Sequence, residues 1–141
     1  MRPMRKAVLR DRACRVNSDE RASTAEVLIV ERDRRVRAGL ARLARESGAS
    51  VAVARDVVEY ERYISQSQGA PSVVVVSLDH DAASVLRFIS TLTAEGQRVI
   101  ATASDGSWRA AAIGAGAAVV LEKDDQLPRL LITWLERLLR S

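Results

Sequence analysis

From Val27 onward, the chain alternates between short aliphatic runs and longer stretches whose apolar residues recur at helical spacing. The aliphatic runs have the length and composition of buried parallel strands. Five such runs occur, at residues 27–30, 50–54, 73–76, 99–103 and 118–121. The third run contains four consecutive valines, whose β-branched side chains favour a strand over a helix.

Each aliphatic run is followed by a stretch that predicts a helix, at residues 34–46, 57–66, 83–92, 107–112 and 127–139. In the last stretch the apolar residues fall at i, i+3, i+4, i+7, i+8 and i+11, which is one helix face. Asp81 is the predicted N-cap of the third helix. Gly114 and Gly116 are expected to close the fourth helix, so they do not indicate a phosphate-binding loop, which would open a helix.

Strict alternation of strand and helix predicts a parallel sheet that is covered by helices on both faces. We therefore expect an α/β fold, a flavodoxin-like (βα)5 doubly wound sheet with strand order 2-1-3-4-5, formed by residues 26–141. Two helices should cover one face and three the other. In such a fold a ligand site lies at the carboxyl ends of strands one and three.

The charge of the chain is concentrated before this domain. Residues 1–25 hold seven basic and three acidic residues, which accounts for the formal net charge of +4, and the remaining residues are balanced. This segment has no hydrophobic periodicity, so we expect a disordered basic tail. A solvated tail or a mis-assigned start is favoured over an arm that binds nucleic acid or a membrane surface, and the domain itself is not expected to bind nucleic acid.

The composition excludes several classes of protein. Hydrophobic residues make up 48% of the chain but aromatic residues only 4%, so aliphatic side chains must build the core. Cys14 is the single cysteine, which excludes a disulfide framework and a thiolate metal cluster. No apolar run reaches the length of a membrane span, and no apolar stretch follows the early arginines as in a secretory signal. We expect a cytoplasmic protein without a cofactor.

The residues at the ends of four predicted strands form a specific layout. Glu31 and Arg32 follow the first strand, Ser77 follows the third, Ala103 ends the fourth, and Lys123 follows the fifth. This layout, over residues 26–140, resembles the receiver domain of two-component response regulators. The resemblance implies two acids that hold Mg²⁺ after the first strand and an aspartate that accepts a phosphoryl group after the third. It also implies a hydroxyl and a lysine that bind the phosphoryl group.

The chain departs from this pattern at three positions. Glu31 and Lys123 match the first acid and the lysine, but Arg32 replaces the second acid, Ser77 the phosphoacceptor and Ala103 the hydroxyl residue. Ser104 or Thr102 could supply that hydroxyl only through a one-residue shift, which turns a strand side chain to the opposite face. The resemblance thus predicts a degenerate pseudo-receiver.

Two further positions differ from the family. Asp124 stands where receivers usually have a cis-proline after the lysine, and Val120 replaces an aromatic residue that changes rotamer on activation.

Charge decides what such a pocket can hold. Three carboxylates and one lysine carry about −2, which suits a hard divalent cation. Glu31, Arg32 and Lys123 together carry about +1, and the arginine would repel Mg²⁺. We therefore expect no metal, with Arg32 or Lys123 in the metal position and bonded to Glu31.

These residues leave three hypotheses for function. The first is a stand-alone receiver-like signalling domain that acts by phosphorylation-independent protein–protein interaction and is not an enzyme. The second is a working phosphoacceptor that uses Asp79, two residues after Ser77. The third is a small α/β nucleotide-binding protein or enzyme, for which the glycine-rich loop is missing after strand one. His80, in the same loop as Asp79, is interpreted as an ordinary loop residue.

The partner of such a domain would be a signalling protein or kinase, or a second copy of the chain. Receivers commonly pair through the fourth helix, fifth strand and fifth helix. The arginine-rich first helix is an alternative surface, because receivers dock kinases there. The candidate interface residues on the first of these surfaces are Trp108, Arg129, Glu136, Arg137, Leu139 and Arg140.

Overall fold

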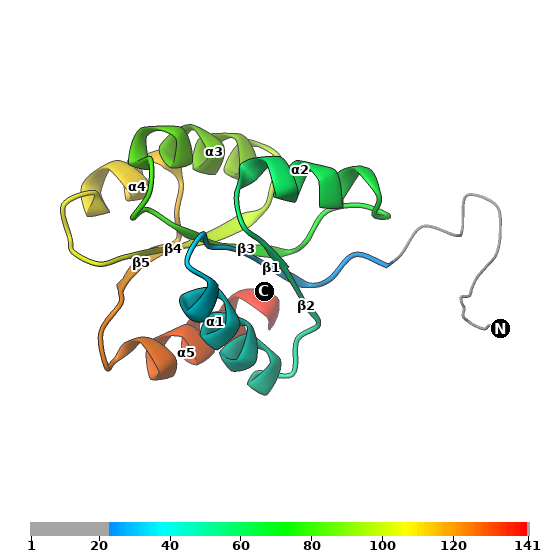
Figure 1. Ribbon diagram of the computed structural model, residues 1–141, viewed down its shortest axis with the longest axis horizontal. Coiled ribbons are helices and arrows are strands. Elements are labelled where there is room, and N and C mark those ends of the chain that lie inside the picture. The colour runs from blue at the N-terminus through cyan, green and yellow to red at the C-terminus, as the bar shows by residue number, and fades with distance from the viewer. Residues whose placement is uncertain (1–22, 141) are drawn as a thin grey trace, which may run out of the picture.

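The computed structural model describes residues 23–140 and contains five strands and five helices in strict alternation (Figure 1). The strands pair in parallel in the order β2-β1-β3-β4-β5, which confirms the predicted flavodoxin-like fold. The elements are β1 (Val27–Val30), α1 (Arg34–Glu46), β2 (Val51–Ala54), α2 (Val57–Ser65), β3 (Val73–Ser77), α3 (Ala82–Ala94), β4 (Arg98–Ala103), α4 (Arg109–Ala115), β5 (Val119–Glu122) and α5 (Leu127–Arg140).

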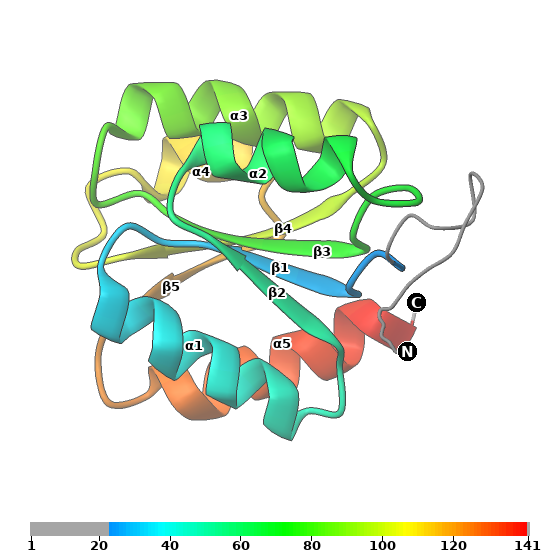
Figure 2. The ribbon, with the colours of Figure 1, turned by 45° about the vertical axis from the view of Figure 1, so that its right-hand side comes forward.

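The helices form two layers around the sheet. Figure 2 shows α2, α3 and α4 on one face and α1 and α5 on the other, the predicted division into three and two. Successive side chains of a strand point to opposite faces, so each strand serves both layers. In β3, Val74 and Val76 pack toward the three-helix layer, and Val73 and Val75 pack toward the two-helix layer.

Several element boundaries differ from those predicted. The fourth helix begins at Arg109 and not at residue 107, because the Asp105 carboxylate accepts the Ser107 N–H and forms a turn first. Gly114 lies inside this helix, and Gly116 alone ends it, with φ of 119°. The third helix continues past the predicted end to Ala94.

The segment before β1 contacts the domain at the first described residues. Thr24 Oγ1 donates to the Gly69 carbonyl, and the Ala25 N–H donates to the Tyr63 hydroxyl. The rest of the predicted basic tail, residues 1–22, lies outside the described residues. Within the part of the chain that the structure describes, no helix is both long and apolar enough to cross a membrane.

Candidate functional site

Three polar side chains meet around one ammonium group at the carboxyl ends of the central strands. Lys123 follows β5, and its Nζ donates to Glu31 Oε1 at 2.8 Å, to Ser77 Oγ at 3.0 Å and to Asp79 Oδ2 at 2.7 Å. Glu31 follows β1, Ser77 ends β3, and Asp79 lies in the β3–α3 loop. We call Glu31, Ser77, Asp79, Ser104 and Lys123 the lysine cluster.

Glu31 is the most enclosed member of the lysine cluster. Its side chain is fully buried, and that of Lys123 is 14% exposed. The second carboxylate oxygen, Oε2, accepts the Asp33 N–H at 2.8 Å. Since both oxygens have a donor, the charge of Glu31 is compensated within the protein, as a buried carboxylate requires.

Asp79 is held from two sides. Its Oδ1 accepts the Ser104 N–H at 2.7 Å, and its Oδ2 accepts both the Ser104 hydroxyl and Lys123 Nζ at 2.7 Å. Burial by itself raises the pKa of Asp79, but the hydrogen bonds from Lys123 and Ser104 outweigh burial and lower it overall. Asp79 is therefore an ionised carboxylate with both oxygens engaged.

The pKa of Lys123 shifts in the opposite direction. Burial lowers its pKa, but the hydrogen bonds to Asp79 and Glu31 outweigh burial, so the pKa of Lys123 is raised overall. The ammonium group is thus charged across the physiological range and is shared between two carboxylates. With one cation, Lys123, and two anions, Glu31 and Asp79, the lysine cluster carries a formal net charge of −1. The predicted +1 counted Arg32, which lies outside the cluster, and did not count Asp79.

One member of the lysine cluster, Ser104, differs from the prediction based on strand register. Ala103 is buried as the last residue of β4 and supplies no hydroxyl, as expected. Ser104 reaches the site nevertheless, because it lies beyond the end of the strand, where side chains no longer alternate strictly between two faces. The sequence argument that excluded Ser104 was therefore wrong.

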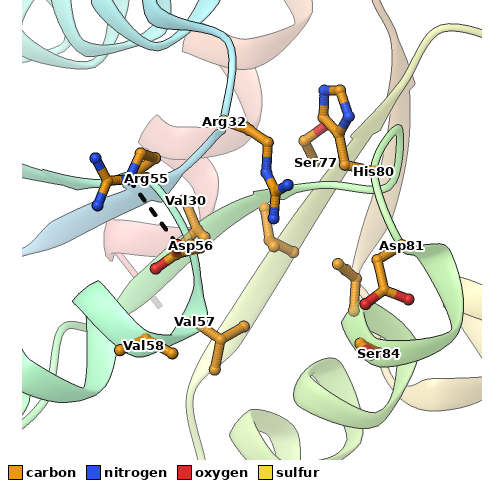
Figure 3. A pocket seen from close by; sticks show the side chains of 12 residues that line it. Val30, Arg32, Arg55, Asp56, Val57, Val58, Ser77, His80, Asp81 and Ser84 are labelled. Atoms are coloured by element: carbon orange, nitrogen blue, oxygen red, sulfur yellow. Dashed lines mark ion pairs between the residues drawn. The ribbon is translucent and has the colours of Figure 1, made fainter.

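Of the two residues predicted to bond Glu31, Lys123 makes the bond and Arg32 does not enter the lysine cluster. Adjacent residues of an extended chain point in opposite directions. Because Glu31 points toward Lys123, Arg32 points away from it, into a neighbouring pocket that it shares with His80 and Asp81 (Figure 3).

The donor set of the lysine cluster does not suit Mg²⁺. This ion requires near-octahedral oxygen coordination with charged carboxylates. Here the oxygens of Glu31 and Asp79 are occupied by N–H, O–H and ammonium donors. Among residues 23–140, no three His, Cys, Asp or Glu side chains lie close enough to hold a metal ion.

The predicted interface residues lie on α4 and α5, on either side of the edge strand β5. Trp108 precedes α4 and is 43% exposed, and Ile113 of α4, which the sequence analysis did not single out, is 47% exposed. Leu139 is only partly exposed because it packs against the core under α5. The Arg137 guanidinium lies 4.8 Å from the ring centre of Trp134. The remaining candidates, Arg129, Glu136 and Arg140, are exposed on α5.

Comparison with known proteins agrees with this architecture. No family model and no curated protein matches the sequence. Among solved structures, a response regulator from Thermotoga maritima has 18% identity and a TM-score of 0.70, covering 85% of this chain and 99% of that one. An orphan response regulator of H. pylori has 18% identity and a TM-score of 0.67, covering 85% and 98%.

A third similar structure is a putative pilus assembly protein, CpaE, from Burkholderia thailandensis, with 20% identity, a TM-score of 0.66 and coverage of 85% and 100%. At these identities the likeness concerns the fold. The chain has the receiver-domain fold of response regulators.

Proposed function

We propose that the chain is a cytoplasmic, non-enzymatic, receiver-like signalling domain that acts through protein–protein interaction without being phosphorylated. The observation that carries this proposal is the lysine cluster. In receivers, the lysine and the hydroxyl residue bind an incoming phosphoryl group. In this chain, Lys123 and Ser104 are already bonded to the carboxylate of Asp79.

The same contacts suggest how the conformation is fixed. The Ser104 N–H and hydroxyl both bind Asp79, so the β4–α4 loop is tied to the β3–α3 loop by internal bonds. Val120, in place of the aromatic residue that changes rotamer in receivers, is buried in the core. A domain with these two features presents one surface permanently, which is the behaviour expected of an interaction module.

Intact-mass spectrometry after incubation with acetyl phosphate and Mg²⁺ tests the proposal. We expect no phosphoryl adduct on the wild-type domain. The variant Ser77→Asp is a useful comparison, because it restores the acceptor while leaving Arg32 in place of the second metal ligand.

The second candidate function, phosphorylation of Asp79, rests on the distance of 2.7 Å between this carboxylate and Lys123. An adduct on the wild-type domain that disappears in Asp79→Asn would establish this candidate and overturn the first. We favour the first because both oxygens of Asp79 are engaged by donors.

The surface that we propose for the interaction lies along β5. A groove of about 400 Å³ runs between α4 and α5 and is lined by Arg109, Leu130, Trp134 and the residues of β5. Arg109 and Glu122 form an ion pair of 3.2 Å at its side. Trp108 and Ile113 provide exposed apolar area beside it. Aromatic and arginine residues with apolar neighbours are typical of interface centres.

The simplest occupant of this surface is a second copy of the chain, because a two-fold axis lets one patch pair with itself. Sedimentation velocity at micromolar concentration should show a dimer that Trp108→Ala weakens by roughly tenfold. Glu136→Arg should change the dimerisation constant less, because exposed ion pairs contribute about 0–1 kcal/mol. A monomer at all concentrations would leave a different protein as the partner.

A further inference from the structure

A second cavity lies beside the lysine cluster, at the carboxyl ends of β1, β2 and β3 and on the side of α2 and α3. Its volume is about 220 Å³. Valines form its apolar wall, among them Val30, Val57, Val76 and Val85. Arg32 and Asp81 stand at its rim (Figure 3).

Arg32 extends over this apolar wall without an anionic partner. Figure 3 shows its side chain directed into the cavity. Within residues 23–140, no carboxylate lies in ion-pair distance of its guanidinium. Arg55, the other arginine at the rim, contacts Asp56 at 3.9 Å and Glu59 at 3.6 Å. Arg32 is therefore the cation at this cavity that is available to a ligand.

Asp81 is the complementary anion. It occupies the N-cap position of α3, but its side chain accepts no hydrogen bond from the helix, contrary to the capping that the sequence predicts. Among the described residues it is the one non-glycine residue with a positive φ, at 52°. Backbone strain of this kind occurs preferentially at functional sites. The strained backbone holds the Asp81 carboxylate at the cavity rim, free of a capping role.

The charges of the rim restrict what the cavity can bind. A simple anion would pair with Arg32 but would face the carboxylate of Asp81. A simple cation would pair with Asp81 but would face Arg32. A ligand that carries both charges can pair with both side chains. An aliphatic group on the same ligand can pack against the valines.

The volume restricts the size of the ligand. At about 30 Å³ per water molecule, the cavity has room for roughly seven waters. This is the size of a small metabolite and below the range of about 300–1,000 Å³ typical of pockets for drug-sized ligands. A branched aliphatic α-amino acid has this size and carries one charge of each sign.

We propose that this cavity is a binding site for a zwitterionic aliphatic amino acid. Arg32 binds its carboxylate, Asp81 binds its ammonium group, and the valines contact its side chain. The cavity and the lysine cluster share Ser77, but Asp79 and Lys123 do not line the cavity. The proposal therefore stands whether or not Asp79 accepts a phosphoryl group.

Titration of the ¹⁵N-labelled full-length protein with L-leucine, L-isoleucine and L-valine tests this inference. We expect saturable shifts of amide resonances at Arg32, Val57 and Asp81, with a dissociation constant on the order of 0.1–1 mM for at least one of the three, as befits so small a ligand. Two analogues remove one charge each from leucine: 4-methylpentanoate lacks the ammonium group, and isopentylamine lacks the carboxylate. Both should bind roughly 10- to 100-fold more weakly, since each loses a charge-assisted contact.

Variants locate the site. Arg32→Gln and Asp81→Asn should each weaken binding roughly 10- to 100-fold. Both side chains are exposed, and asparagine also tolerates a positive φ, so both variants should fold. Arg42→Gln and Asp125→Asn, at exposed positions that do not line the cavity, are matched controls that should bind like the wild type.

Absence of saturable shifts up to about 10 mM of all three amino acids would overturn the proposal. Full binding by both rim variants, or binding of either analogue as tight as that of leucine, would also overturn it.

Discussion

At the scale of single residues, Lys123 is the central group of the site, because it neutralises two carboxylates that come from different parts of the chain. Burying charged groups costs free energy that only good pairing and complete hydrogen bonding can offset. The lysine cluster meets this condition, since Glu31 and Asp79 have a donor for each oxygen. Removing one member should therefore cost more than the loss of an exposed ion pair.

We expect Glu31→Ala to lower the free energy of unfolding by about 2–4 kcal/mol. Breaking a buried ion pair typically costs about 3–5 kcal/mol, and the Asp79 and Ser77 contacts that Lys123 retains reduce this cost. Urea unfolding at neutral pH measures the effect. Glu46→Ala, at the exposed end of α1, is the matched control and should change stability by less than about 0.5 kcal/mol. Equal stability of the two variants would mean that the cluster is solvated and weak.

The pKa shifts of the lysine cluster predict a pH dependence of stability. The folded pKa of Asp79 is lowered, so its contribution is present above the unfolded pKa of about 3.9 and is lost as the pH falls through the folded pKa. The folded pKa of Lys123 is raised, so its contribution is present below about pH 10.4 and is lost as the pH rises through the folded pKa.

The difference in unfolding free energy between the wild type and Asp79→Asn should therefore be largest between about pH 5 and 9, at about 1–2 kcal/mol. It should be smaller at lower and at higher pH. Urea titrations at a series of pH values measure this difference. A difference that stays constant with pH would show that the charge of Asp79 does not contribute.

The sequence identified part of this site. The positions of Glu31, Ser77 and Lys123 followed from counting residues to the ends of strands, because parallel strands end at one edge of the sheet. The contact between Ser104 and Asp79 did not follow, because both residues lie in loops, where strand alternation gives no direction for a side chain. The choice between Arg32 and Lys123 as the partner of Glu31 stayed open, because charge attraction favours both residues. The opposite directions of adjacent side chains in an extended chain favour Lys123.

At the scale of elements, the junction between α3 and α4 depends on one glycine. Gly116 ends α4 at a φ of 119°, and a Cβ atom at this position would lie 2.5 Å from Thr93 Oγ1. That hydroxyl lies within hydrogen-bond distance of two carbonyls of α3 and of the Ala115 carbonyl. The two helices therefore meet where only a residue without a side chain fits.

We expect Gly116→Ala to lower the free energy of unfolding by about 2–3 kcal/mol, because both the backbone strain and the contact with Thr93 oppose it. Gly114→Ala provides the matched comparison. Gly114 lies inside α4 with open space around its Cβ position, so alanine should raise stability by about 0.5–1 kcal/mol. Thermal unfolding followed by circular dichroism measures both. Effects of the same sign would contradict this account of the junction.

The sequence predicted every strand and helix but not all of their ends. Whether a segment forms a strand or a helix is predicted by the period of its apolar residues, and this period is set by several residues together. Ends depend on single hydrogen bonds, such as the turn that Asp105 forms with Ser107 before α4. The two glycines of α4 are indistinguishable in sequence, and only the geometry of the chain shows which of them stops the helix.

At the scale of the whole molecule, one sheet supports two cores. Leu28 and Val30 of β1 belong to the core under α2, α3 and α4, while Val27 and Ile29 belong to the core above α1 and α5. Neither core can lose its strands without exposing the other, so the two should unfold together. The doubly covered parallel sheet followed from the sequence because buried aliphatic strands require helices on both faces. The strand order was predicted from the flavodoxin-like topology that suits five such units.

Two tryptophans allow this expectation to be measured, because Trp108 lies beside α4 on one face and Trp134 lies in α5 on the other. In Trp108→Phe the fluorescence reports the α5 face, and in Trp134→Phe it reports the α4 region. Within each variant, the urea midpoint from fluorescence should coincide with the midpoint from far-ultraviolet circular dichroism. Midpoints that differ in either variant would show that one layer unfolds before the other.

The ion pair between Glu31 and Lys123 joins residues 92 positions apart in the chain, and this separation governs how long the folded state lasts. A contact that needs both the first and the last strand in place forms late in folding, because closing so long a loop is entropically costly. Interactions absent from the folding transition state act on the unfolding rate alone. The loss of about 2–4 kcal/mol in Glu31→Ala should therefore accelerate unfolding roughly 30- to 1,000-fold and leave the folding rate nearly unchanged. Stopped-flow kinetics of this variant measures how much the Glu31–Lys123 pair contributes to the lifetime of the native state.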